Sequence, residues 1–197
     1  MLYFPKNEIK RKLFHLLALI YVVAFWYLPK AIVLTALAIL IITTLTIEII
    51  RARNNTFNGL MLKVFDGFYR ESEKHKVAGV LWTLLGAFLT IIIFNDRLCV
   101  LVSFLYLVFG DTLAALFGKT FGKHKFIHGN KSLEGSTACF LICLIIGLFA
   151  FPSWQVALAG AFAATVVEAI PWPLNDNLWM QIVNAGILTL LIKVLPI

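Results

Sequence analysis

Seven long apolar runs limit what this chain can fold into. They fall near residues 13–28, 31–50, 77–94, 98–117, 134–151, 155–170 and 178–195. A helix needs about 20 mostly apolar residues to cross the roughly 30 Å hydrocarbon core of a bilayer, and somewhat shorter runs are tolerated. The sequence therefore predicts an all-α, polytopic membrane bundle of about seven transmembrane helices, forming one domain over residues 1–197.

The distribution of positive charge predicts how the bundle is oriented. The chain is 61% hydrophobic and 14% charged, with a net charge of +7. In a soluble chain that charge could indicate nucleic-acid binding, but in a membrane protein Lys and Arg collect on the cytoplasmic side. With alternate sides assigned to successive runs, one side holds 14 of the 17 Lys and Arg residues. We therefore expect a multi-pass cell-membrane protein with a cytoplasmic N-terminus and no nucleic-acid partner.

The connection between the second and third runs contains an amphipathic pattern. Phe57, Leu60, Met61, Val64, Phe65 and Phe68 recur at helical spacing. Such a face is typical of a helix that lies in the membrane interface. The helix could guide a lipid toward a site, or it could be a structural connector that rests on the membrane.

A carboxylate lies within the fourth apolar run. Asp111, Ala115 and Gly118 have the i, i+4, i+7 spacing of one helix face. An ionisable residue at membrane depth is costly, and it normally faces the bundle interior or a wet cavity. The alternative is a structural Asp paired with a lysine. We interpret Asp111 as functional.

A basic, glycine-rich loop follows this run. It includes Gly118, Lys119, Gly122, Lys123 and Lys131, and the next helix is expected to begin near Ser132, with Gly135 in its first turn. Glycine lets backbone N–H groups approach an anion closely, and a helix N-terminus attracts negative charge. The spacing does not match a P-loop. The pattern indicates nucleotide phosphate binding at the membrane surface.

Other charged residues are expected on the same cytoplasmic side. Arg11 and Lys12 lie where the first run begins, and they either bind phosphate or anchor the helix. Glu134 and Asp176 suit helix N-termini, so helix capping alone could explain them. Glu168 lies in the last turn of a helix, where the dipole disfavours an acid and a cationic partner is expected. Asn177 follows Asp176 at the start of the last run.

These motifs together resemble the family of dolichol kinases, phytol kinases and yeast-type CTP-dependent diacylglycerol kinases. The resemblance is carried by Gly110-Asp111-Thr112, Lys131-Ser132-Leu133-Glu134-Gly135, Glu168, Asp176-Asn177 and Arg11-Lys12 with His15. It implies transfer of the γ-phosphoryl group of CTP to the hydroxyl of an isoprenoid alcohol or diacylglycerol. It also implies essential roles for Arg11, Lys12, Asp111 and Gly118.

Phosphoryl transfer requires charge neutralisation and positioning more than covalent chemistry, which assigns roles to these residues. Mg²⁺ is expected on Asp111 with Glu134. Glu134, Glu168 or Asp176 could complete the metal shell or accept the proton of the alcohol. Nucleotide and phosphate binding is expected from Arg11, Lys12, Gly118, Lys119, Gly122, Lys123, Lys131, Ser132, Gly135 and Asn177. The alternatives are a phosphatidate cytidylyltransferase and a small ion-coupled transporter.

Overall fold

A computed structural model describes residues 6–69, 73–74, 76–126 and 131–195. Within these ranges the regular structure is helical, apart from one isolated antiparallel bridge between Lys125 and Ser132. The elements are α1 Lys6–His15, η1 Leu16–Ala18, α2 Leu19–Tyr27, α3 Lys30–Arg53, α4 Asn55–Val64, α5 Gly79–Ile93, α6 Arg97–Leu105, η3 Tyr106–Asp111, α7 Thr112–Phe121, α8 Leu133–Ala150, α9 Trp154–Ala169 and α10 Asp176–Val194. The prediction of an all-α fold is confirmed.

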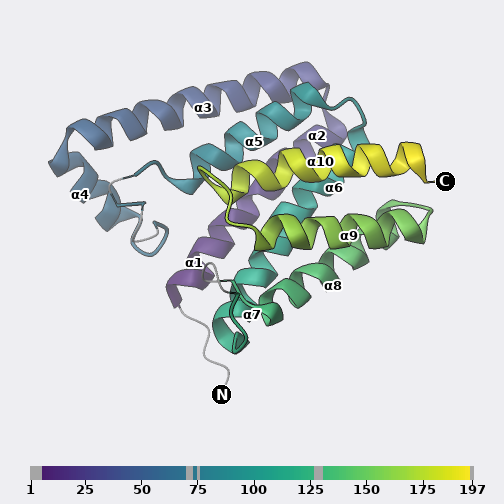
Figure 1. Cartoon of the computed structure of the whole chain (residues 1–197). Helices are drawn as coiled ribbons and strands as arrows, with labels where there is room; N and C mark the ends of the chain where they lie inside the picture. The colour runs from purple at the N-terminus through teal and green to yellow at the C-terminus, as the bar shows by residue number, and fades with distance from the viewer. Residues whose placement is uncertain (1–5, 70–72, 75, 127–130, 196–197) are drawn as a thin grey trace.

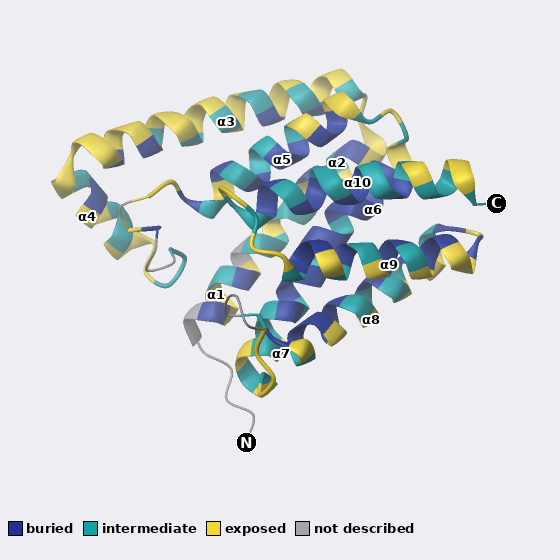
Figure 2. Ribbon diagram, in the orientation of Figure 1, coloured by how far each residue is buried: buried dark blue, intermediate teal, exposed yellow. Residues whose placement is uncertain are grey.

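The helix that carries the predicted functional carboxylate forms the centre of the bundle. α6, η3 and α7 make one continuous helix over Arg97–Phe121, and 67% of its most apolar window is buried, against 17% for α3. α8 packs along α7 and α9, while α10 packs between α5 and α9 (Figure 1). Exposed residues run along much of α3 (Figure 2), and many of them are large and apolar. α3 is thus a peripheral helix with a surface suited to lipid.

The lengths of the helices bear on the number of membrane spans. In the described part of the chain, α3, the α6–α7 helix, α8 and α10 are long and apolar enough to cross a membrane. α5 and α9 have 15 and 16 residues, respectively, and α2 has nine after the 3₁₀ turn η1. All seven predicted runs are helical, but these lengths do not confirm seven spans.

One end of the bundle collects the segments predicted to be cytoplasmic. The start of α1, the end of α3 with α4, and the junctions between α7 and α8 and between α9 and α10 lie toward that end (Figure 1). The turns that join α2 to α3 and α8 to α9 lie at the other end. The positions of these segments agree with the alternation that was assumed in counting Lys and Arg, while the number of spans and the orientation stay predictions.

This arrangement predicts which engineered cysteines react from outside. In intact cells, Lys63→Cys and Lys123→Cys are expected to resist an impermeant maleimide, whereas Asn95→Cys is expected to react, because basic loops stay cytoplasmic. The native Cys99, Cys139 and Cys143 are buried and free, so they give little background. Labelling of Lys63→Cys or Lys123→Cys from outside would contradict the predicted orientation of the protein in the membrane.

Two details of the fold differ from simple helical periodicity. Residues Tyr106–Asp111 form a π-helical segment within the central helix, so Asp111 ends a widened turn. Such π-bulges occur frequently at functional sites. The amphipathic helix is shorter than its pattern predicts, because α4 ends at Val64 and Phe65 is its C-cap residue. Its buried residue is the polar Asn58, while Leu60 and Val64 are exposed.

Candidate active site

A buried ion pair joins the first helix to the central helix. The Lys12 ammonium contacts Oδ2 of Asp111 and donates a hydrogen bond of 3.0 Å to the Asp111 backbone carbonyl. Nε2 of His15, one turn along α1, lies 3.9 Å from Asp111 Oδ2. Lys12 and Asp111 are each 3% exposed. Residues 99 positions apart thus form one charged centre, as expected for an intramembrane carboxylate that faces the interior.

A second centre forms around Lys131, in the loop before α8. Its ammonium contacts the Glu168 carboxylate at the end of α9 and lies 3.6 Å from Oδ2 of Asp176 at the start of α10. Ser136 Oγ donates a hydrogen bond of 3.4 Å to Glu168. Burial lowers the pKa of Lys131, but the carboxylates of Asp111, Glu168 and Asp176 outweigh it, and the pKa is raised. Lys131 therefore remains charged, and Glu168 has the cationic partner that its position predicts.

Glu8 is a site residue that sequence reasoning missed. Its carboxylate contacts both Arg11 on its own helix and Lys119 on α7, and it is 5% exposed. Burial raises the pKa of Glu8, yet its contacts with Lys119 and Arg11 lower it overall. In a basic N-terminal segment Glu8 resembled an ordinary solvated acid, and its spacing to Arg11 was the available signal. Glu8 therefore connects α1 to the last turn of α7.

Glu134 and Ser132 shape the loop itself. The Glu134 carboxylate accepts hydrogen bonds from the backbone N–H groups of Lys123 and His124 at 3.1 and 3.3 Å, and it contacts His124 Nδ1 at 2.9 Å. Ser132 caps α8 by accepting from the Gly135 N–H at 3.2 Å. Ser132 is therefore the N-cap of α8, whereas the Glu134 carboxylate binds the backbone of the preceding loop. Their roles in metal and nucleotide binding stay predictions.

The carboxylates near Lys131 have the chemistry that Mg²⁺ requires. Among the residues described, no three His, Cys, Asp or Glu side chains form a ready-made metal cluster. Mg²⁺ bound with a nucleotide usually needs only one or two carboxylates, because phosphates and water supply the other ligands. Asp111, Glu168 and Asp176 all act electrostatically on Lys131. This donor set fits the ion, whereas the contacts of Glu134 do not connect it to Asp111.

The predicted phosphate-binding glycines bring two helices into close contact. A Cβ atom on Gly135 would lie 2.6 Å from the Ala114 carbonyl oxygen and 3.1 Å from Cα of Gly118. A Cβ on Gly122, the C-cap residue of α7, would lie 2.7 Å from Oγ of Ser132, the N-cap residue of α8. Glycine at these positions lets α7 and α8 pack backbone to backbone. Nucleotide binding by Gly118, Gly122 and Gly135 remains a prediction.

This packing predicts a stability difference between two glycine variants. Gly135→Ala is expected to destabilise the protein by about 1–3 kcal/mol, because overpacking forces the backbones apart. Gly59→Ala on α4 is the matched control, since nothing lies within 4 Å of its added Cβ. Alanine has the better helix propensity, by about 1 kcal/mol. Thermal unfolding in detergent should show a lowered midpoint temperature for Gly135→Ala only. Equal midpoint temperatures for the two variants would mean that Gly135 is not needed for helix packing.

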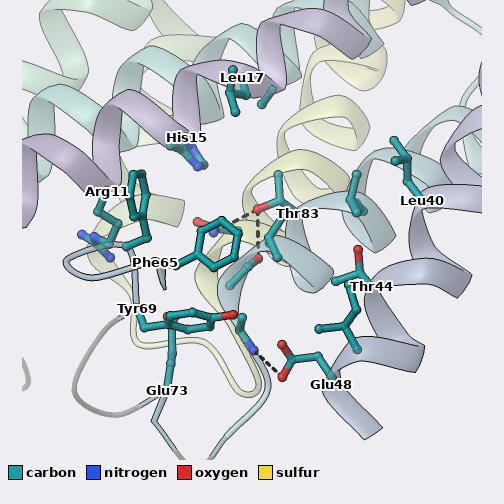
Figure 3. A pocket seen from close by; sticks show the side chains of 18 of the residues that line it. Arg11, His15, Leu17, Leu40, Thr44, Glu48, Phe65, Tyr69, Glu73 and Thr83 are labelled. Carbon is teal, nitrogen blue, oxygen red and sulfur yellow. Dashed lines mark hydrogen bonds between the residues drawn. The ribbon is translucent and has the colours of Figure 1, made fainter. Parts of the chain in front are cut away.

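A cavity of about 440 Å³ extends from the Lys12–Asp111 pair. It lies among α1–α2, α3, α4 and α5, and Asp111 and Asn177 reach it from the central helix and α10. Figure 3 shows His15, Thr44, Phe65 and Thr83 around the space. Asn177 donates a hydrogen bond of 3.1 Å to Thr83 Oγ1. Asn177, which the sequence assigned to nucleotide, therefore lies beside an apolar cavity.

A polar network holds the α4 segment over one side of this cavity. Arg51 on α3 donates hydrogen bonds to Glu48 at 2.6 Å, to Asn58 Oδ1 at 3.1 Å and to the Glu73 carbonyl at 3.2 Å. Its guanidinium also lies 4.3 Å from the centre of the Tyr69 ring. Because Tyr69 and Phe65 line the cavity, this network fixes part of its wall (Figure 3).

Comparison with known proteins gives consistent matches. The model of the Cytidylyltransferase family matches residues 3–195. The chain is 31% identical to CTP-dependent diacylglycerol kinase 1 of Schizosaccharomyces pombe, over 76% of this chain and 77% of that protein. It is also 31% identical to the uncharacterized protein RP860 of Rickettsia prowazekii, over 87% of this chain and 88% of that one. CTP-dependent diacylglycerol kinase 1 of Eremothecium gossypii is 27% identical, over 93% and 67% of the respective chains. No solved structure gives a significant match.

Proposed function

The chain belongs to the Cytidylyltransferase family, and we propose that it is a CTP-dependent lipid kinase. Its relatives in two yeasts are named CTP-dependent diacylglycerol kinases. The proposed reaction transfers the γ-phosphoryl group of CTP to the hydroxyl of diacylglycerol or of an isoprenoid alcohol at the cytoplasmic surface. The observation that carries the proposal is the Lys12–Asp111 pair, which lines an apolar cavity and whose carboxylate also interacts electrostatically with Lys131.

The cations supply the charge neutralisation that phosphoryl transfer needs. Arg11 and Lys119 are paired with Glu8, Lys12 with Asp111, and Lys131 with Glu168. A triphosphate that binds here replaces carboxylate oxygens with phosphate oxygens, so the cations keep an anionic partner throughout. Arg11 and Lys119 come from α1 and α7, so the nucleotide would bridge these two helices.

The carboxylates have two tasks in this proposal. Asp111, Glu168 and Asp176 are the residues that would hold Mg²⁺, which would supply neutralisation of the charge that develops in transfer. Asp111 also lines the cavity, so it is the carboxylate placed to orient the attacking hydroxyl. The hydroxyl oxygen forms a bond to the γ-phosphorus as the bond to the β-phosphate oxygen breaks, the alcohol proton passes to one of these carboxylates, and CDP leaves.

The runner-up is a cytidylyltransferase that acts on phosphatidate, as the family's name suggests. That enzyme attacks the α-phosphorus of CTP with a phosphate oxygen and releases pyrophosphate. The names of the two yeast relatives favour the kinase.

A substrate panel tests the kinase proposal. Purified protein is incubated with CTP or ATP, with and without Mg²⁺, and with diacylglycerol, a prenol or phosphatidate. Lipid phosphate formed from an uncharged alcohol, with CTP and Mg²⁺ required, is the expected product. Formation of CDP-diacylglycerol from phosphatidate, with no lipid phosphate from any alcohol, would support the runner-up.

A further inference from the structure

Three buried polar atoms in residues that line the cavity have no hydrogen-bond partner in the described part of the chain. They are Asn177 Oδ1, His15 Nε2 and Arg11 Nε. Asn177 is only 7% exposed, so water does not readily satisfy it. Buried polar groups are almost always hydrogen-bonded, and an exception at a cavity points to a missing ligand.

The chemistry of these atoms defines the missing group. The amide nitrogen of Asn177 donates to Thr83 Oγ1, which leaves Oδ1 as an acceptor. His15 Nε2 lies 3.9 Å from Asp111 Oδ2 and makes no hydrogen bond among the described residues. The tautomer that carries its proton on Nε2 donates from that atom, so one hydroxyl can donate to Asn177 Oδ1 and accept from His15 Nε2. Arg11 Nε donates. A hydroxyl group, which both donates and accepts, matches this set.

The charges on the cavity wall favour an uncharged head group. Its cations are already compensated, because Arg11 contacts Glu8 and Lys12 contacts Asp111. Two further carboxylates, Glu48 and Glu73, line the same space. In the proposed reaction Arg11 and Lys12 bind the triphosphate, so a phosphate monoester in the cavity would be a second anionic group with no cation of its own, which is unfavourable in a poorly solvated site.

The mouth of the cavity is apolar and open. Leu17, Ile20 and Leu40 line it, and they are 53%, 67% and 50% exposed. They lie on η1, α2 and α3, and the exposed surface of α3 is largely apolar. In a bilayer these side chains face hydrocarbon, so a lipid tail reaches the cavity without crossing water.

We propose that this cavity is the acceptor site, and that it binds an uncharged lipid alcohol. The tail lies between α2 and α3, and the hydroxyl is held by Asn177 and His15 beside Asp111. The inference rests on the proposed function, and it assigns Asn177 to lipid binding, whereas the sequence predicted that Asn177 binds nucleotide. Diacylglycerol and prenols share the required chemistry, namely one free hydroxyl on an apolar body.

Photo-crosslinking tests the site without requiring turnover. The full protein in detergent micelles is irradiated with a diacylglycerol, or with a prenol, that carries a diazirine on its chain. We expect adducts on peptides of α2 and α3 that fall at least fivefold under excess unlabelled alcohol but persist under excess phosphatidate. The probe with the stronger saturable labelling identifies the preferred alcohol.

A matched pair of tryptophan variants makes the result specific. Thr44→Trp fills the cavity from α3 (Figure 3), whereas Ile42→Trp adds the same bulk to an α3 side chain that is 64% exposed and does not line the cavity. The adducts are expected to fall at least fivefold in Thr44→Trp and to persist in Ile42→Trp. If the amount of adduct is unchanged in Thr44→Trp, or if the adducts are spread evenly over all apolar helices, the proposed acceptor site is wrong.

Kinetics separates this inference from the proposed function. Asn177→Leu is expected to raise the KM for the lipid alcohol at least tenfold and to leave the KM for CTP unchanged. A raised KM for CTP with an unchanged KM for the lipid alcohol would assign Asn177 to nucleotide binding. That result would reject the inference and leave the kinase proposal standing. Saturable, Thr44-sensitive labelling in a protein that phosphorylates no alcohol would support the lipid site and reject the kinase.

Discussion

Asp111→Asn is expected to lower the turnover number by about 10²–10³-fold, the cost of removing one preorganised electrostatic group from an active site. Asp111 pairs with Lys12, acts on Lys131 and lines the cavity, so its charge serves both substrates in the proposed reaction. Asparagine keeps the size of the side chain and removes that charge. The measurement is the rate of lipid phosphate formation at saturating CTP, lipid and Mg²⁺.

The controls for Asp111→Asn separate catalysis from folding. Asp96→Asn should be silent, because Asp96 caps α6 by accepting from the Cys99 N–H at 2.8 Å, and asparagine caps equally well. Removing one member of a buried pair leaves the other uncompensated and costs about 3–5 kcal/mol. The double variant Lys12→Gln with Asp111→Asn avoids that unpaired charge. It should regain thermal stability and remain inactive. Substantial activity in either Asp111 variant would show that Asp111 is not required for catalysis.

Lys131→Met is expected to lower kcat/KM for CTP about 100-fold. A hydrogen bond to a charged group contributes about 1.5–3 kcal/mol, and 1.4 kcal/mol corresponds to a factor of ten. Lys131 contacts Glu168 and Asp176, so its loss also leaves two carboxylates to repel the triphosphate. Initial rates at varied CTP and fixed lipid measure the effect.

Lys125→Met is the matched control for Lys131→Met. Lys125 lies in the same loop, its side chain is exposed, and its backbone forms a bridge with Ser132. Both variants remove one positive charge from the same face, so a general loss of surface potential would affect them similarly. Equal losses in the two variants would mean that the loop acts through its net charge and that Lys131 has no specific contact with nucleotide.

Apolar run length was sufficient to predict the all-α architecture, since it depends on local sequence and a bilayer requires helices. Charge asymmetry predicted the orientation in the membrane, which stays a prediction. The position of Glu168 against a helix dipole also predicted a cationic partner, and the structure supplies Lys131. Membrane thickness is less informative for short helices, so the sequence did not settle the number of spans.

The features that the sequence could not predict depend on contacts between distant helices. Pairing of Lys12 with Asp111 needs the packing of α1 against the central helix, and the π-helical turn before Asp111 has no local signature that was recognised. Glu134 pointed to a metal site by residue type alone, whereas its contacts lie with the loop backbone. The cavity could not be predicted because its wall is assembled from helices that are far apart in the sequence.

The fate of the phosphates of CTP tests the central claim most directly. The protein is incubated with CTP labelled at the γ-phosphate or, in a parallel reaction, at the α-phosphate, together with diacylglycerol, a prenol and phosphatidate. The account predicts γ-label on an uncharged lipid alcohol, with release of CDP and no α-label in any lipid. Label from the α-phosphate on phosphatidate, with release of pyrophosphate, would contradict it, and so would the absence of label from every lipid.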